Sequence, residues 1–189
     1  TKKKQKINIH LSPETPDTSK HKCLVLGIFA DERPPRGICG FIDWRLNGLI
    51  SREIKKGRIA GDFAEKVIIP FPPRINSEIL MLCGMGNTSQ CSTKQIFQVA
   101  YQLIASIDKL QIDDFSFELP DEKRVNLSIT EVAEAVASGF FGYLSRDAGK
   151  PNKITPRLLT FPEQVKEAAK GIKNFKSKIK KEDFPKMIF

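Results

Sequence analysis

Residues 78–89 read Glu-Ile-Leu-Met-Leu-Cys-Gly-Met-Gly-Asn-Thr-Ser, an apolar run followed by a glycine-containing segment. A continuous apolar run such as residues 78–83 is typical of a strand that is covered on both faces. The glycine segment 84–87 predicts a tight turn, and the spacing of Ser92 and Gln95 is that of a capping box at a helix start. Apolar residues then recur in steps of four and three, which predicts an amphipathic helix. Together these signals describe one unit of an α/β fold.

Similar units lie on both sides of this stretch. Residues 23–29 and 66–71 are further apolar runs that predict buried strands. The alternation in residues 114–119 predicts a half-exposed strand, and residues 157–161 predict a short one. Helices are expected over residues 43–56, over residues 130–144 and from Pro162 onward. The first of these helices should turn its apolar side chains inward, namely Trp44, Leu46, Leu49, Ile50 and Ile54. Strands alternating with helices indicate an α/β fold with a mixed sheet flanked by helices.

The net charge of +9 is distributed unevenly along the 189 residues. Residues 1–22 carry six Lys against two acidic residues (+4), and residues 170–189 carry seven against two (+5). The stretch between them holds 18 basic and 18 acidic residues and is neutral, unlike a folded domain that binds nucleic acid through its body. We therefore expect a basic flexible arm over residues 1–22, a single α/β domain over residues 23–181 and an apolar tail over residues 182–189.

The cysteines and histidines do not form a motif for a metal or a disulfide. The four cysteines show no CxxC pair, which favours reduced thiols and a cytoplasmic location. His10, His21 and Cys23 are too few for a closed zinc site, and we read them as unrelated. The carboxylates Asp113, Asp114, Glu118, Asp121 and Glu122 gather in sequence, but strand ends and turns collect such residues for solvation. No metal site is expected, and no apolar run approaches the ~20 residues of a membrane span.

Two segments carry binding hypotheses. The glycine turn precedes a helix, where free amides can receive a phosphate; its candidate ligand-binding residues are Gly84, Gly86, Asn87, Thr88 and Ser89. A lone GxG is a weak signal, however, and a simple tight turn is the favoured interpretation. The last helix is basic and amphipathic, and its candidate residues for nucleic acid or a partner are Lys166, Lys170, Lys173, Lys180 and Lys181. A solvated lysine-rich face is the commoner explanation. Both histidines lie in the predicted arm, so we predict no catalytic residues.

The order of short motifs along the chain resembles that of a known family. The motifs are residues 24–29, Gly40-Phe-Ile-Asp43, Gly48-Leu-Ile-Ser51, Lys56-Gly57, Ile59-Ala-Gly61, residues 65–71, residues 78–87 with Gly-Met-Gly, residues 134–150 and residues 157–178. They resemble the N-terminal domain of the leucyl (cytosol) aminopeptidases. This resemblance implies a layered, macro-domain-like α/β fold. In that family the divalent metals and the catalytic residues belong to the C-terminal domain, whose Asn-Thr-Asp-Ala-Glu-Gly-Arg segment does not occur here. We therefore carry over no catalytic residue and no cofactor.

The resemblance leads to a non-catalytic interaction or assembly domain as the expected function. We expect self-association or binding of a partner protein, with nucleic acid as a further candidate partner through the basic ends. One alternative is a small-ligand module that holds a nucleotide or ADP-ribose over residues 84–89. Another alternative is that the chain is a fragment of a metal-dependent leucyl aminopeptidase, which leaves open whether the whole protein is an enzyme.

Overall fold

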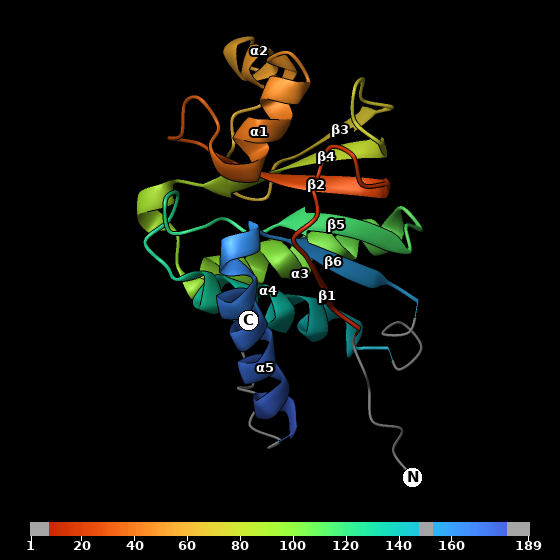
Figure 1. Ribbon diagram of the computed structural model, residues 1–189, viewed down its shortest axis with the longest axis vertical. Coiled ribbons are helices and arrows are strands. Elements are labelled where there is room, and N and C mark those ends of the chain that lie inside the picture. The colour runs from red at the N-terminus through yellow and green to blue at the C-terminus, as the bar shows by residue number, and fades with distance from the viewer. Residues whose placement is uncertain (1–7, 148–152, 181–189) are drawn as a thin grey trace.

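The computed structural model describes residues 8–147 and 153–180, which form a six-stranded mixed sheet between two layers of helices (Figure 1). The strands are β1 (His10–Ser12), β2 (His21–Phe29), β3 (Lys66–Pro70), β4 (Ser77–Gly86), β5 (Asp114–Glu118) and β6 (Thr155–Leu159). Their order is β1-β6-β5-β2-β4-β3, and β3 is antiparallel to its neighbour β4 whereas the other pairs are parallel. The predicted α/β fold with a mixed sheet is confirmed.

The helices cover the two faces of the sheet unequally. On one face lie α1 (Gly37–Arg45) and α2 (Leu49–Lys55), which bury a core drawn mainly from β2, β3 and β4. The other face carries α3 (Thr93–Lys109) and α4 (Ile129–Leu144), with α5 (Val165–Lys180) packed on α4. Two short 3-10 turns, η1 (Thr88–Gln90) and η3 (Pro162–Gln164), precede α3 and α5. The larger core lies under α3 and α4. None of the helices in the described ranges is long and apolar enough to cross a membrane.

The single helix predicted over residues 43–56 is wrong, because the chain forms α1 and α2 with a break between them. Asn47 (φ 57°) and Gly48 (φ 73°) adopt left-handed backbone there, which ends a right-handed helix. The Asp43 carboxylate accepts hydrogen bonds from the backbone N–H groups of Ile50 (2.8 Å) and Ser51 (3.2 Å), so it caps the start of α2. Trp44 is 70% exposed rather than facing the core, because it lies two residues from the buried Ile42 and Leu46 and therefore on the opposite side of α1.

The predicted strand at residues 66–71 and the predicted glycine turn also need correction. The first is β3, an edge strand, and Ile68 within it is 46% exposed rather than buried. Gly84 and Gly86 are not in a turn, because they are part of β4. A Cβ atom on Gly84 would lie 1.8 Å from the carbonyl oxygen of Asp62. The glycine therefore permits the backbone around Asp62 to pass close to β4.

The strand predicted over residues 114–119 is β5, but it is central rather than half-exposed. Its polar residues Ser116 and Glu118 are at most 1% exposed. Part of the predicted N-terminal arm also joins the sheet: residues 10–12 form β1 beside β6, and His21 begins β2. The predicted apolar tail, residues 182–189, lies outside the described residues.

Candidate functional site

The carboxyl ends of β2 and β5 meet where ligands would be expected in this class of sheet. Strand β2 leads through α1 and α2 to β3 and β4 on one side, whereas β5 leads through α4 to β6 on the other. Adjacent parallel strands whose connections diverge in this way form a topological switch point, and open α/β sheets bind ligands in the crevice outside it. The segments that border this crevice are residues 30–36, after β2, and residues 119–128, after β5.

The crevice is filled by the side chains of Glu32, Glu118 and Arg124, here called the Arg124 cluster. The Arg124 guanidinium donates to Glu32 through Nε (3.0 Å) and Nη2 (2.8 Å), and to Glu118 through Nη1 (3.0 Å). Its Nη2 also donates to the carbonyl oxygen of Gly27 (2.9 Å). The side chains of Arg124 and Glu118 are 1% exposed and that of Glu32 is 6% exposed. A ligand could enter this crevice only by displacing a buried, fully paired ionic group.

Backbone donors explain how two carboxylates share one guanidinium. Glu118 Oε1 accepts from Gly27 N–H (2.9 Å) and Oε2 from Cys39 N–H (3.0 Å), while Glu32 accepts from Arg36 N–H (3.0 Å). Burial raises the pKa of Glu118, with Arg124 acting in the opposite direction. The groups that hydrogen-bond to Glu118 are all donors, which favours an ionised carboxylate. Burial opposes the charge on Arg124, but Glu118 and Glu32 hold its pKa above the ordinary value.

The predicted ligand-binding residues lie beside this crevice and already receive an anion from the chain itself. Thr88 donates to the Asp31 carboxylate through its backbone N–H and its Oγ1, each at 2.8 Å. These bonds, first of all that from the Thr88 N–H, lower the pKa of Asp31. Gly84 and Gly86 belong to strand β4, and the carbonyl of Gly86 accepts a hydrogen bond from Ala30 N–H (2.9 Å). Binding of a free phosphate at Asn87, Thr88 and Ser89 stays a prediction, and it requires that Asp31 be displaced.

The structure brings together a serine and a histidine that the sequence placed apart. His21 lies in β2 rather than in a loose arm, and its Nδ1 is 2.7 Å from Ser116 Oγ. Its Nε2 is 2.8 Å from the carbonyl oxygen of Pro16, so Nε2 carries the proton and Nδ1 accepts from the serine. Burial lowers the pKa of His21. Both side chains are at most 1% exposed, so no substrate reaches the pair and its role is structural.

The thiols and carboxylates considered above do not assemble into a reactive centre. Burial raises the pKa of Cys23 to about 12 and the pKa values of Cys83 and Cys91 to about 11, which keeps them as thiols at neutral pH. Asp113 is paired with Lys22 (2.5 Å) and Asp114 with Arg157 (3.7 Å). Within the described ranges, no three His, Cys, Asp or Glu side chains lie close enough together to hold a metal ion.

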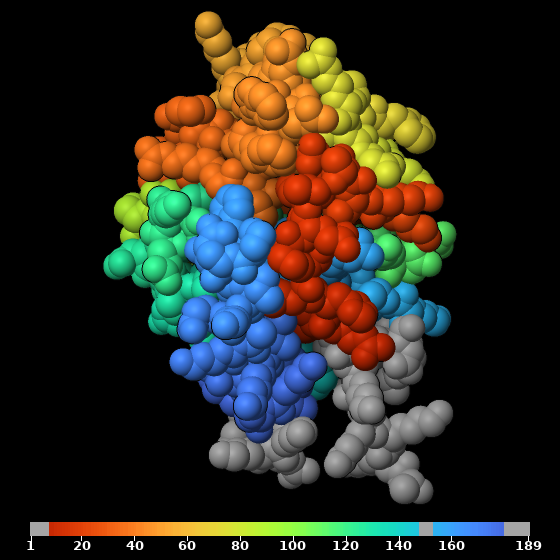
Figure 2. Space-filling model, in the orientation of Figure 1, coloured from red at the N-terminus to blue at the C-terminus, as the bar shows by residue number. Residues whose placement is uncertain are grey.

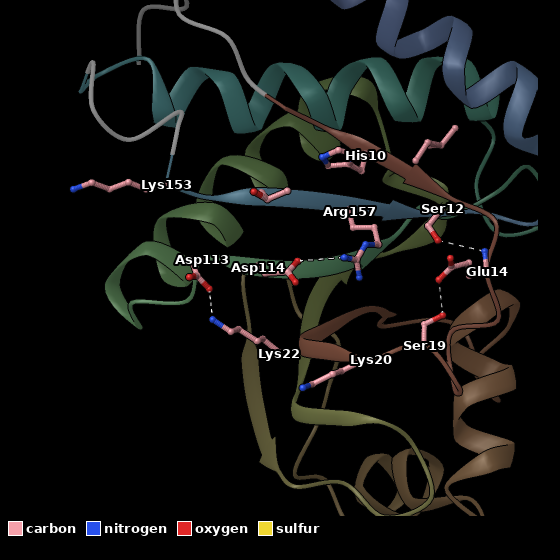
Figure 3. Close-up of a pocket in the computed structure, with 12 residues that line it drawn as sticks. His10, Ser12, Glu14, Ser19, Lys20, Lys22, Asp113, Asp114, Lys153 and Arg157 are labelled. Carbon is pink, nitrogen blue, oxygen red and sulfur yellow. Dashed lines mark hydrogen bonds and ion pairs between the residues drawn. The ribbon is translucent and has the colours of Figure 1, made fainter.

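An open hollow on the α1 side of the sheet was not predicted from the sequence. This polar groove, of about 710 Å³, lies over the amino ends of β5 and β6 and beside β1. Its polar lining consists of His10, Ser12, Glu14, Ser19, Lys20, Lys22, Asp113, Asp114, Lys153, Thr155 and Arg157. Figure 3 shows Lys22 directed at Asp113 and Arg157 at Asp114, whereas Lys153 extends away from the other side chains. The lining comes from segments far apart in sequence, so no local pattern could reveal it.

The predicted basic residues of the last helix lie on its outer face. Lys166, Lys170 and Lys173 are exposed, as is Lys176, and these four form the lysine stripe of α5. The opposite side of α5 is buried through Ala168, Ile172 and Phe175. Figure 2 shows α5 in blue at the surface beside the N-terminal segment in red. The side chain of Lys180 and the whole of Lys181 lie outside the described part of the chain.

Large apolar side chains are exposed at the end of the sheet that carries β3. Phe71 is 80% exposed, and Phe63 and Ile68 are 40% and 46% exposed. On α1, the rings of Phe41 and Trp44 lie 6.1 Å apart at the surface. Isolated exposed apolar residues need no explanation, but several on one edge strand and its flanks are a candidate interaction surface.

The sequence matches the family described as the cytosol aminopeptidase family, N-terminal domain, over residues 25–147. It is 26% identical over 125 residues to a probable cytosol aminopeptidase of Thermosynechococcus vestitus, covering 66% of this chain and 24% of the relative. A probable cytosol aminopeptidase of Colwellia psychrerythraea is 23% identical over 146 residues, covering 75% of this chain and 29% of the relative. The chain thus matches less than a third of the length of these relatives.

Solved structures show the same fold at low sequence identity. A mutant of tomato leucine aminopeptidase superposes with a TM-score of 0.64 at 17% identity, covering 95% of this chain and 38% of that one. An Oceanobacillus iheyensis macrodomain solved with ADP gives a TM-score of 0.71 at 12% identity, covering 96% and 97%. The predicted macro-domain-like fold is confirmed by this similarity.

Proposed function

We propose, from the premise that this chain belongs to the cytosol aminopeptidase family and corresponds to its N-terminal domain, that it is a non-catalytic interaction domain. The observation that carries the proposal is the Arg124 cluster. The switch point, where a macro-like sheet would hold a ligand, is occupied by buried side chains with paired charges. At the switch point the chain then offers no open cavity, and the exposed apolar residues at the β3 end supply a surface for a partner instead.

The proposal excludes two alternatives that a pair of assays can separate. We expect no hydrolysis of leucyl-p-nitroanilide with added manganese or zinc, and a flat calorimetric titration with ADP-ribose up to millimolar ligand. Turnover that survives purification and disappears on chelation would contradict the proposal and favour a metal-dependent aminopeptidase. A saturating ADP-ribose isotherm would favour the small-ligand module, and Thr88→Ala, which removes one bond to Asp31, would then alter the affinity. A cytoplasmic location accompanies the proposal, because the relatives are cytosol aminopeptidases and the four cysteines are free.

A second candidate function is the binding of nucleic acid along the lysine stripe of α5. The observation in its favour is that Lys166, Lys170 and Lys173 follow one another at helical spacing on an exposed face, whereas Glu167 lies on a different side beside Thr130. Backbone binding of this kind weakens steeply with salt, by about 0.9 in log affinity per phosphate contact for each tenfold rise in salt.

The test of this candidate is a pair of matched triple variants. Replacing Lys166, Lys170 and Lys173 by Ala should lower the affinity for a double-stranded oligonucleotide and reduce the slope of log affinity against log salt. The control triple replaces Lys55, Lys56 and Arg58, which are basic and exposed at the end of α2. It should leave the affinity and the salt slope unchanged. Binding that does not depend on salt, or that responds equally to the two triples, would remove this function.

A further inference from the structure

We propose that β3 pairs with β3 of a second copy of this chain, antiparallel about a two-fold axis at Ile68, so that the two sheets join edge to edge. This inference rests on the proposed function, because it names the surface and the partner of an interaction domain. Strand β3 is last in the strand order, and among the described residues it is hydrogen-bonded in the sheet to β4 alone (Figure 1). Its outer edge is therefore a row of backbone groups open to another strand.

The hydrogen bonds to β4 identify which backbone groups face outward. On the two flanks of β3, the carbonyl of Glu65 accepts from Gly84 N–H (2.7 Å) and Phe71 N–H donates to the carbonyl of Glu78 (2.8 Å). The backbone N–H and C=O groups of successive residues point to alternate edges of an antiparallel strand, so those of the odd-numbered residues point toward β4. The even-numbered residues Lys66, Ile68 and Pro70 consequently turn their N–H and C=O groups to the free edge.

Pro70 fits a two-fold pairing centred on Ile68. In that register Ile68 faces its own copy and the two residues exchange both backbone hydrogen bonds. Lys66 of each copy faces Pro70 of the other, so its N–H donates to the proline carbonyl. Proline has no N–H, and in this register Pro70 acts only as a hydrogen-bond acceptor. Every outward N–H group of the strand is then bonded.

Side-chain pairing selects this register over its neighbours. With the axis at Ile68, the isoleucine lies opposite its copy and Val67 lies opposite Ile69, so apolar residues pair on both faces. Moving the axis to Lys66 would set two lysines directly opposite, which is destabilising. Moving it to Val67 would set Ile68 opposite Lys66 and Ile69 opposite Glu65. Moving it to Ile69 would set Ile68 opposite Pro70, which has no N–H for the Ile68 carbonyl. Side chains and backbone together therefore favour the alignment centred on Ile68.

Exposure and charge around the strand agree with a second copy as the occupant. Ile68, which is 46% exposed, would be covered by its copy, and Phe71, which is 80% exposed, would lie beside Glu65 of the other chain. Asp62 precedes the strand and Arg74 follows it, and both are exposed. Antiparallel pairing puts the acidic residue of each copy at the same end as the basic residue of the other. A five-residue edge is small for an interface, so we expect a reversible dimer in the micromolar range.

Cysteine cross-linking tests the register directly. In the proposed dimer the two copies of residue 68 lie about 5.5 Å apart between Cα atoms, within the range a disulfide spans. Ile68→Cys should therefore give a reducible covalent dimer under mild oxidation. Leu110→Cys is the matched control, because Leu110 is 45% exposed on a different element, and it should cross-link far less. Equal cross-linking of the two variants would overturn the inference.

Sedimentation velocity over a range of concentrations supplies the second test. The unmodified chain should shift from monomer toward dimer, Ile68→Asp should remain monomeric because two carboxylates would face each other, and Leu110→Asp should still dimerise. A dimer that persists in Ile68→Asp would overturn the β3 pairing while leaving the interaction domain intact. A chain that stays monomeric throughout would also overturn the pairing. Failure of the proposed function itself would appear instead as peptidase turnover or ADP-ribose binding, which neither variant addresses.

Discussion

The two ends of β5 carry the same kind of charge in opposite environments. Asp114 and Glu118 are four residues apart on one strand, so their side chains leave the same face of the sheet. The Glu118 side chain is 1% exposed inside the Arg124 cluster, whereas that of Asp114 is 38% exposed in the polar groove, 3.7 Å from Arg157. The comparison indicates that the cost of breaking an ion pair depends on whether water can replace the lost partner.

The cause of the difference is the uneven cover on this face of the sheet. Helices α1 and α2 pack over β2, β3 and β4, and the segments after β2 and β5 fold over the carboxyl end of β5. Among the described residues, no helix covers the amino ends of β5 and β6 on this face, and the polar groove lies there (Figure 3). At the closed end water cannot take the place of a lost partner, and at the open end it can.

The largest expected effect is at the closed end. Arg124→Met removes the partner of two buried carboxylates, and we expect it to lower the free energy of unfolding by about 3–5 kcal/mol. Urea denaturation followed by circular dichroism measures this loss. The matched change at the open end is Arg157→Met, which breaks a partly exposed pair and should cost at most about 1 kcal/mol. Similar losses in the two variants would show that burial does not separate the two ends.

The middle of β5 gives an effect of intermediate size that depends on pH. Burial lowers the pKa of His21, which bonds to Ser116, so the unfolded chain binds a proton more readily than the folded one. Stability should therefore be full above about pH 6.5, the ordinary pKa of histidine, and should fall as the pH decreases toward the folded value. Each unit of depression is equivalent to about 1.4 kcal/mol. Thermal unfolding at pH 7.5 and pH 5.5 measures the difference.

The control for this pH dependence is His21→Gln, which keeps polar groups at the site but does not titrate. The variant should lose less stability than the unmodified chain over the same pH interval, even if it is less stable at pH 7.5. An equal pH dependence in both proteins would assign the effect to other groups and would contradict a neutral, buried His21.

Much of the fold was predictable because its signals are local. The apolar runs around residues 23–29 and 78–83 and the apolar periodicity after Ser92 predicted β2, β4 and α3. The order of the motifs predicted the family. The misread helix at residues 43–56 also had a local warning, since Asn47-Gly48 is a typical turn pair. That pair marks where α1 ends, and the angle of about 200° between Trp44 and the buried Leu46 is a second local sign that both cannot face the core.

The site was less predictable because its contacts are not local. Glu118 accepts hydrogen bonds from the backbone N–H groups of Gly27 and Cys39, which lie 91 and 79 positions away in sequence, and only its partner Arg124 is near it in sequence. The alternation in residues 114–119 correctly predicts a strand, but it also predicts a polar face in water, whereas two of the three polar side chains, Ser116 and Glu118, are buried against protein. Likewise, residues 84–89 were recognised as suited to an anion, but the sequence did not indicate that Asp31, more than 50 positions earlier, supplies it.

The smallest expected effect on stability comes from the loss of Lys22 in the polar groove. This change should alter the pKa of Asp113 without altering the stability of the fold. The hydrogen bond and charge of Lys22 lower the pKa of Asp113. A depressed carboxyl pKa adds stability at neutral pH that is lost as the pH falls through the folded value. Because this pair is exposed, we expect Lys22→Met to return the pKa of Asp113 toward its ordinary range in a carboxyl NMR titration without a measurable change in the urea midpoint. Added salt should move the pKa of Asp113 in the same direction by screening, whereas the buried pair of Arg124 and Glu118 should be insensitive to it. A Lys22→Met variant that unfolds at clearly lower urea would mean that the groove, like the closed end, depends on its charges for stability.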